Sequence, residues 1–413
     1  MNSLNNSFLK TVLLITLFLL LFCGANLLTY MGVDVKFFRS ILIAVAIPLL
    51  FINLKYVIWN RPLLVILVVV SLFSILKLYT DTGEGTRMAV LQLLGAPIIY
   101  ASYPKINDRL TIHRVILWRK FFFLFIAFFL LVTGMAIIER IMGATILGWA
   151  ENKIYLLSDY AASEFRSTSL LGHPLYNALV VTIMMAYILI SPLKPKFKLL
   201  LWFVGYFAIL CFNTRGSIVG NALLFGLYIL YSVFFDKTQS RKTKKLLSII
   251  SITAAIVVLI VIFSTSLGGR FLEHGLMDDS AQVRVDVWNV FNYFELSDFF
   301  WGVTYNKLQM ILAASGIYAT ENFWLDQLFS FGLVFMIAYV LMYATLIVKL
   351  LKNYTRFQAL FVSGAFLLIA STNNSLSSDF LALFIFLMLT HLFDPKYIRL
   401  LIPRKYLIKP FKK

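Results

Sequence analysis

The chain has 413 residues, of which 61% are hydrophobic and only 14% are charged. Apolar runs long enough to cross about 30 Å of hydrocarbon recur along its whole length, so the composition excludes a soluble globular protein and predicts an all-α, polytopic integral membrane protein. The formal net charge of +18 would suit nucleic acid, but a basic excess in a membrane protein usually reflects topology. The lipid bilayer is therefore the expected partner, and no nucleic acid is expected.

Twelve transmembrane helices are predicted in chain order, within a single membrane domain that covers residues 1–413. The first is expected to stay uncleaved, because the residues around Cys23 make a poor signal-peptide cleavage site. The spans cover about 11–29, 38–54, 63–80, 88–103, 121–138, 174–192, 199–212, 217–235, 246–263, 328–348, 357–371 and 378–393.

The charged residues between these spans indicate the topology. With a cytoplasmic N-terminus, the inner segments hold most of the 37 Lys and Arg residues, and the outer segments hold most of the 19 Asp and Glu residues. This asymmetry agrees with the positive-inside rule and predicts that both termini are cytoplasmic. The basic tail, residues 394–413, is then expected to lie on the anionic inner leaflet.

Residues 264–327 form the longest segment that cannot lie in lipid, a large external loop between spans nine and ten. Apolar residues recur with helical spacing in DVWNVFNYF and KLQMILAASGIY, so a structured loop with short helices is expected. The cytoplasmic loops are short and contain no Gly-rich phosphate loop. An enzyme that uses cytosolic nucleotide-activated substrates is thus disfavoured, and chemistry is expected on the outer face, with 264–327 as the catalytic loop.

Outward-facing arginines are the sharpest functional signal, because the topology bias drives basic residues inward. Arg166, Arg215, Arg270 and Arg284 all fall in outer segments. Arg215 is wedged between two apolar runs, where an unpaired guanidinium costs a few kcal/mol. Its planar fork suits a phosphate or diphosphate, although an ion pair with an outer carboxylate or snorkelling is the alternative.

Arg284 and Trp288 lie four residues apart, so on an α-helix they would share a face. Cation–π packing against the indole would then fix the direction of the guanidinium. A solvated helix with a buried tryptophan is the simpler alternative. Both interpretations place this pair in the external loop.

His173 precedes Pro174, a good first residue of a helix, and Asn177 follows one turn later. A helix N-terminus favours anions, so His173 and Asn177 are candidate substrate contacts, unless His173 is only a cap or a surface residue. Glu321 and Asn322 stand just before span ten. Glu321 would be either a general base on a hydroxyl or the counter-ion of an arginine, and the sequence leaves both open.

No metal site is predicted, because the four histidines are scattered and no acidic pair has convincing ligand spacing. No cofactor is expected either. The arginines would supply positive charge without a metal.

In their order along the chain, these motifs resemble the O-antigen ligase/polymerase family of bacterial surface-polysaccharide enzymes. The resemblance covers mainly residues 160–335 and is carried by Arg166…Gly172-His173-Pro174…Asn177, Thr214-Arg215-Gly216, Arg284…Trp288 and Glu321-Asn322…Leu325…Gly332-Leu333.

The resemblance implies an enzyme of the bacterial cytoplasmic membrane whose active site faces outward. Its external arginines would hold the diphosphate of an undecaprenyl-diphosphate-linked glycan, and a chain-length regulator protein is a further expected partner. The family's ligases carry a His immediately before the Asn of the last motif, where this chain has Glu321. That departure favours a Wzy-type polymerase, a glycosyltransferase that joins repeat units of O-antigen, capsule or exopolysaccharide.

The resemblance then suggests residue roles. Glu321, Arg284 and Arg215 would be catalytic, and Arg166, His173, Asn177, Trp288 and Asn322 would bind substrate. Two alternatives stay open: an O-antigen ligase-type transferase, and a flippase for lipid-linked oligosaccharides. A transporter usually carries charges within its spans, and these spans are almost free of them.

Overall fold

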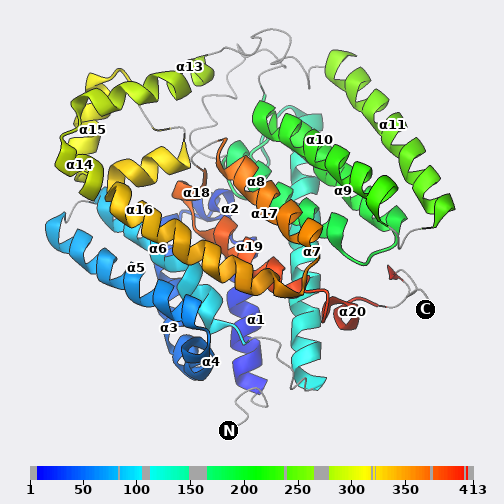
Figure 1. The fold of residues 1–413 in the computed structure, drawn as a ribbon, viewed down its shortest axis with the longest axis horizontal. Coiled ribbons are helices and arrows are strands. Elements are labelled where there is room, and N and C mark those ends of the chain that lie inside the picture. Colours follow the sequence, from blue (N-terminus) through cyan, green and yellow to red (C-terminus); the bar gives the residue numbers. More distant parts are fainter. Residues whose placement is uncertain are drawn as a thin grey trace.

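The computed structural model describes residues 7–81, 84–104, 112–147, 165–236, 240–264, 279–317, 320, 322–372, 375–403 and 406–407. Within these ranges the regular secondary structure is helical, apart from one isolated antiparallel bridge between Leu193 and Leu407. The all-α prediction is thus confirmed for the described residues (Figure 1).

The helices follow one another in this order: α1 (Ser7–Phe22), α2 (Ala25–Tyr30), α3 (Val35–Ile52), α4 (Leu54–Trp59), α5 (Arg61–Thr80), α6 (Glu84–Ser102), α7 (Ile112–Met142), α8 (Pro174–Ile190), α9 (Pro195–Phe212), α10 (Arg215–Leu230), the π-helical turn η3 (Tyr231–Phe235), α11 (Arg241–Ser264), α13 (Asp279–Asp286), the 3₁₀ helix η5 (Val287–Tyr293), α14 (Leu296–Trp301), α15 (Tyr305–Ala314), α16 (Phe323–Leu350), the 3₁₀ turn η6 (Leu351–Asn353), α17 (Arg356–Ala370), α18 (Ser375–Ser378), α19 (Leu381–Leu392) and α20 (Ile398–Leu401).

Among the helices described, six are long and apolar enough to cross a membrane: α3, α5, α7, α9, α10 with η3, and α16 with η6. Shorter apolar helices are α1, the part of α6 from Ala89, α8, α17 and α19. By length and composition the chain is therefore a helical membrane protein. Apart from the first, each predicted span overlaps one of these helices or α11, but the number of twelve crossings stays a prediction.

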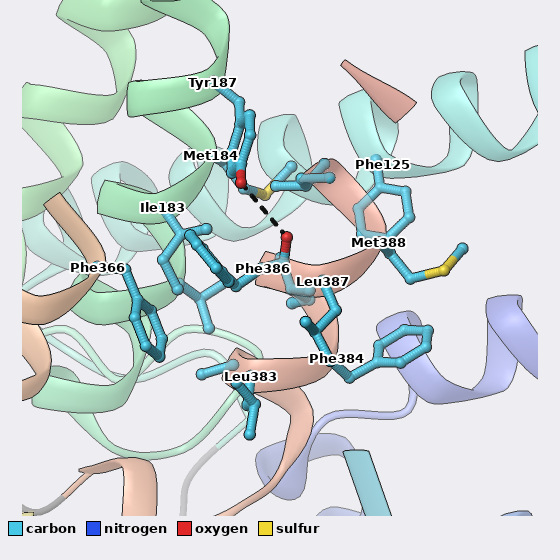
Figure 2. Close-up of a cluster of buried hydrophobic side chains, with 14 of the residues drawn as sticks. Phe125, Ile183, Met184, Tyr187, Phe366, Leu383, Phe384, Phe386, Leu387 and Met388 are labelled. Carbon is cyan, nitrogen blue, oxygen red and sulfur yellow. Dashed lines mark hydrogen bonds between the residues drawn. The ribbon is translucent and has the colours of Figure 1, made fainter. Parts of the chain in front are cut away.

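Two short helices, α8 and α19, form the centre of the bundle. All residues of α19 are buried, and so is nearly all of α8. Figure 2 shows their apolar side chains interleaved, with Phe125 of α7 and Phe366 of α17 on either side. A helix that is apolar all round is typical of such an interior. The longer helices around α8 and α19 are the ones with enough length to cross a membrane.

The first predicted span, 11–29, is wrong as a single helix. It divides at Cys23 and Gly24 into α1 and α2. The cause is close packing, because a Cβ on Gly24 would lie 2.8 Å from the carbonyl carbon of Leu170. The N–H of Asn26 donates to the Leu170 carbonyl oxygen at 3.2 Å, so a distant segment fills the break.

Helices α13, η5, α14 and α15 carry the described part of the predicted external loop, and we call them the cap. The cap has its own apolar core, which includes Val290, Leu312 and Phe329 and is separate from the main core. Figure 1 shows the cap helices at one corner of the molecule, beside the first turns of α16. Short helices at DVWNVFNYF and KLQMILAASGIY are confirmed, the former as a 3₁₀ helix.

Two glycines join the cap to the bundle. Gly332 has φ +81° inside α16, where the helix kinks, and Gly302 has φ +76°. A Cβ on Gly302 would lie 2.7 Å from the Gly332 nitrogen, so neither position accommodates a side chain. Nearby, Lys77 Nζ donates to the Val303 carbonyl oxygen at 3.4 Å, and Asp81 accepts from the N–H of Tyr305 at 2.8 Å.

Candidate functional site

The described residues between α7 and α8, 165–173, carry Arg166 and His173. Ser167, Thr168 and Ser169 are fully buried. The Ser167 and Ser169 hydroxyls donate to carbonyl oxygens of α7 at 2.8 and 2.7 Å. Polar side chains buried in this way must be hydrogen-bonded, so this polar stretch is fixed to the end of α7 and is not a solvated loop.

Glu139 and Arg140, in the last turns of α7, hold the same stretch at two points. The buried carboxylate of Glu139 accepts from the N–H groups of Thr168 at 2.8 Å, Ser169 at 2.9 Å and Ile146 at 3.1 Å. Arg140 donates to the Phe165 carbonyl oxygen at 2.7 Å, and its guanidinium lies 5.7 Å from the centroid of the Phe165 ring. Three N–H donors offset the cost of burying the carboxylate.

Sequence reasoning did not single out Glu139 or Arg140. The available signal was an adjacent opposite charge pair at the end of an apolar helix. Such a pair normally suggests solvent exposure, and only the fold shows that both charges are used on backbone groups.

The structure brings Arg166 to the turn that leads to Arg215. The Nε of Arg166 donates to the Phe212 carbonyl oxygen at 3.3 Å, and the N–H of Ser167 donates to the Cys211 carbonyl at 3.1 Å. Asn213 then ends α9 in the left-handed conformation, with φ +52°. Arg215 is the first residue of α10, two positions later.

The N-terminus of α10 has two buried hydroxyl groups without hydrogen-bond partners in the described structure. Thr214 is its N-cap residue but makes no side-chain capping bond. Thr214 and Ser217 are buried, with exposed fractions of 2% and 1%. Neither hydroxyl has a hydrogen-bond partner within the described structure. Buried hydroxyls, the first N–H groups of a helix and an arginine together favour an anion.

His173 is the N-cap of α8, and its side chain makes no capping bond. His173 is exposed at the surface, but the protein atoms around its imidazole remove part of its hydration. This desolvation, and then the positive charge of Arg166, lower the pKa of His173 to about 4. The imidazole is therefore neutral at physiological pH, and it accompanies Arg166 without adding charge.

Asn177 is fully buried one turn into α8. Its amide nitrogen donates to the carbonyl oxygens of Thr168 at 2.6 Å and His173 at 3.0 Å. These bonds tie the start of α8 to the stretch that carries Arg166. The geometry gives Asn177 a positioning role, which the sequence did not distinguish from substrate contact.

Asn322 caps α16, since its side-chain oxygen accepts from the N–H groups of Trp324 at 2.9 Å and Leu325 at 3.3 Å. The indole N–H of Trp324 donates to the Ser371 hydroxyl at 2.7 Å. The next residue, Thr372, packs on the backbone of α10, because a Cβ on Gly216 would lie 3.3 Å from its Cβ. The turn after α17 thus lies between the starts of α10 and α16.

Ser371 and Thr372 were also missed by sequence reasoning. Their signal was the polar run STNNSLSSD between the last two apolar spans. The run ends at Asp379, which forms a buried ion pair with Arg39 at 3.0 Å. The charge of Arg39, which the sequence predicts on the outer side, is therefore already paired.

The remaining candidates lie in or next to the cap. Helix α13 ends at Asp286 and the chain continues as 3₁₀ helix, so the expected single α-helical face for Arg284 and Trp288 is not formed. Trp288 is 61% exposed, and its ring stacks 5.7 Å from Phe291. The expectation of a buried tryptophan is thus wrong. Arg270, Glu321 and the side chain of Arg284 lie outside the described residues.

No group of three His, Cys, Asp or Glu side chains could hold a metal ion in the part of the chain that the structure describes. Comparison with protein-family models finds no match, and comparison with curated proteins finds no significant similarity.

Proposed function

We propose that this chain is a polysaccharide polymerase, which joins polyprenyl-diphosphate-linked repeat units on the outer face of the cytoplasmic membrane. The observation that supports this most is the placement of Arg166 beside the turn that carries Arg215. Two arginines near a helix N-terminus with two buried hydroxyls suit the negative charge of a diphosphate.

The proposed reaction is a displacement at the anomeric carbon. The acceptor hydroxyl oxygen forms the new glycosidic bond, the bond from the anomeric carbon to the lipid diphosphate breaks, and the acceptor proton passes to Glu321. Arg166 and Arg215 stabilise the charge that develops on the departing diphosphate. Such a displacement inverts the anomeric configuration, which NMR of the newly formed linkage tests directly.

The start of α16 and the cap would position the base and bind the glycan. Asn322 fixes the start of α16 immediately after Glu321, and Trp324 and Ser371 join that start to the turn that packs on α10. The start of α16, which follows position 321 in the sequence, is thus joined to the helix that begins with Arg215. The exposed ring of Trp288 offers a face on which a sugar of the growing chain can stack.

Reconstitution of the purified protein with lipid-linked repeat units tests the proposal. Longer glycans that form without an energy source support a polymerase. Redistribution of repeat units across the bilayer without new bonds would indicate the flippase. In a deletion strain, single repeat units should accumulate, whereas accumulation of long unattached chains would indicate the ligase.

Glu321→Gln separates the two roles proposed for this carboxylate. A general base is needed only in the chemical step, so its loss should lower kcat and leave the donor KM nearly unchanged. A counter-ion of the arginines would instead change the donor KM. Unchanged kcat and KM would remove Glu321 from the mechanism.

A further inference from the structure

A groove runs along an exposed side of α1 and α7, away from the arginine site. It has a volume of about 540 Å³ and is lined by Leu14, Ile15 and Phe18 of α1 and by Lys120, Phe123, Leu124 and Ala127 of α7. Figure 1 shows the two helices side by side over this length. The groove is open to the outside along its length and is not an enclosed cavity.

The two ends of the groove differ. Toward the C-terminal end of α1 the helices meet through aromatic rings, with Phe22 stacked on Phe18 at 4.8 Å and edge-on to Phe128 at 6.0 Å. At the other end stands Lys120, the one charged residue in the lining. Lys10 lies one helical turn before Leu14 on α1, so it belongs to this end as well.

The wall of the groove is apolar and exposed. Ile15, Phe18 and Phe123 are 52%, 47% and 48% exposed, and Ala127 adds only a methyl group to the lining. A flexible hydrocarbon chain fits this surface, with the closed aromatic end at its tip and a negative group near the ammonium groups. The sequence predicts that this charged end faces the cytoplasm, where anionic lipids gather.

We propose that the groove binds one acyl chain of an anionic phospholipid, whose phosphate lies between Lys120 and Lys10. The site is independent of the proposed polymerase activity. A bound lipid would fix the packing of α1 on α7. The last turns of α7 hold residues 165–173, which we call the Arg166 stretch, through Glu139 and Arg140.

Native mass spectrometry of the full chain, with dioleoyl phosphatidylglycerol or dioleoyl phosphatidylcholine as the probe, tests the proposal. The wild type should retain one phosphatidylglycerol in preference to phosphatidylcholine. Lys120→Gln and Lys10→Gln should each reduce that preference about fivefold, the effect of removing one lysine near an anionic headgroup. Ala127→Phe should reduce retention of both lipids, because its ring fills the groove.

Lys196→Gln is the matched control, since Lys196 is an exposed lysine on α9, outside the groove. It should leave the lipid preference unchanged. The proposal is overturned if Lys196→Gln has the same effect as Lys120→Gln, if the Lys10/Lys120 double variant keeps the wild-type preference, or if Ala127→Phe retains both lipids normally. Association of two chains through the groove, without retained lipid, would also overturn it.

Discussion

The Arg166 stretch and the cap carry the candidate residues, and they are held in different ways. The Arg166 stretch is fixed by buried polar groups: Glu139 on its N–H groups, Asn177 on its carbonyls and two serine hydroxyls on α7. The cap is ordered by its own apolar core, and contact at Gly302 and Gly332 joins it to the bundle. Substitutions that change charge or hydrogen bonding should thus affect the Arg166 stretch, and substitutions that add steric bulk should affect the cap.

The largest effect is expected at Arg215. Arg215→Ala should lower elongation about a hundredfold or more, as removal of one donor to a developing anion does elsewhere. Arg215→Lys should also be strongly impaired if two parallel hydrogen bonds to the diphosphate are needed. Elongation of lipid-linked repeat units in proteoliposomes is the measurement.

Arg241→Ala is the matched control, because Arg241 likewise begins a helix, α11, but lies at the predicted inner end. It should elongate normally. Wild-type activity in Arg215→Ala would remove the argument from the arginines. Equal loss in Arg241→Ala would show a general effect on folding or insertion.

Glu139→Gln should have the next largest effect. A carboxamide offers one acceptor oxygen where the carboxylate uses both oxygens on three N–H groups, and each unsatisfied buried group costs about 1–3 kcal/mol. The Thr168 and Ser169 N–H groups should exchange hydrogen faster, and elongation should fall about tenfold as Arg166 loses its fixed position.

Hydrogen exchange reads out this contact whether or not the polymerase proposal holds. The control is Asp34→Asn, since Asp34 also accepts from a backbone N–H, that of Phe37 at 2.7 Å, but caps α3 at an exposed site. Unchanged exchange across 165–173 in Glu139→Gln would contradict the role given to this carboxylate.

Gly332→Ala should act on the cap instead. A Cβ at this position would meet the Gly302 nitrogen at 2.6 Å, and the backbone has φ +81°. Together, the close contact and the backbone conformation should lower the Tm by several degrees. The combination of φ +81° and ψ 166° is adopted almost only by glycine and costs other residues about 1–3 kcal/mol. Thermal unfolding in detergent measures the change.

Gly316→Ala is the control without the close contact, because Gly316 also has a positive φ, +71°, but no described residue beyond its chain neighbours comes within 4 Å of a Cβ at this position. Its Tm should fall less than that of Gly332→Ala. Equal losses in the two variants would mean that the contact between Gly302 and Gly332 contributes nothing measurable.

The helical class and the positions of the helices could be predicted from the sequence, because long apolar runs have few alternatives in a membrane. The break at Gly24 could not, since it depends on Leu170, far along the chain. The same holds for α16, whose first turns belong to the cap core and whose kink at Gly332 depends on Gly302.

For the candidate site, the sequence identified Arg166 and His173, which lie close enough to interact, and Arg215, which follows the turn that Arg166 contacts. It did not identify what holds them. Glu139 looks like one outer carboxylate among many until the fold shows it buried against three N–H groups. Asn177 and Asn322 carry the expected amides, but their hydrogen bonds are made to the backbone.

The smallest effect is expected from the titration of His173. It tests whether the imidazole beside Arg166 is neutral or charged. Desolvation, and then Arg166, lower its pKa to about 4, whereas an ordinary histidine titrates near 6.5. The group is therefore neutral above about pH 5, and its protonation is resisted in the folded state. The unfolded chain binds this proton more readily, so His173 should reduce stability as the pH falls from about 6.5 toward 4. Elongation measured between pH 5 and 8 should show the same profile in the wild type and in His173→Gln, and an inflection near pH 6.5 that disappears in the variant would contradict the lowered pKa.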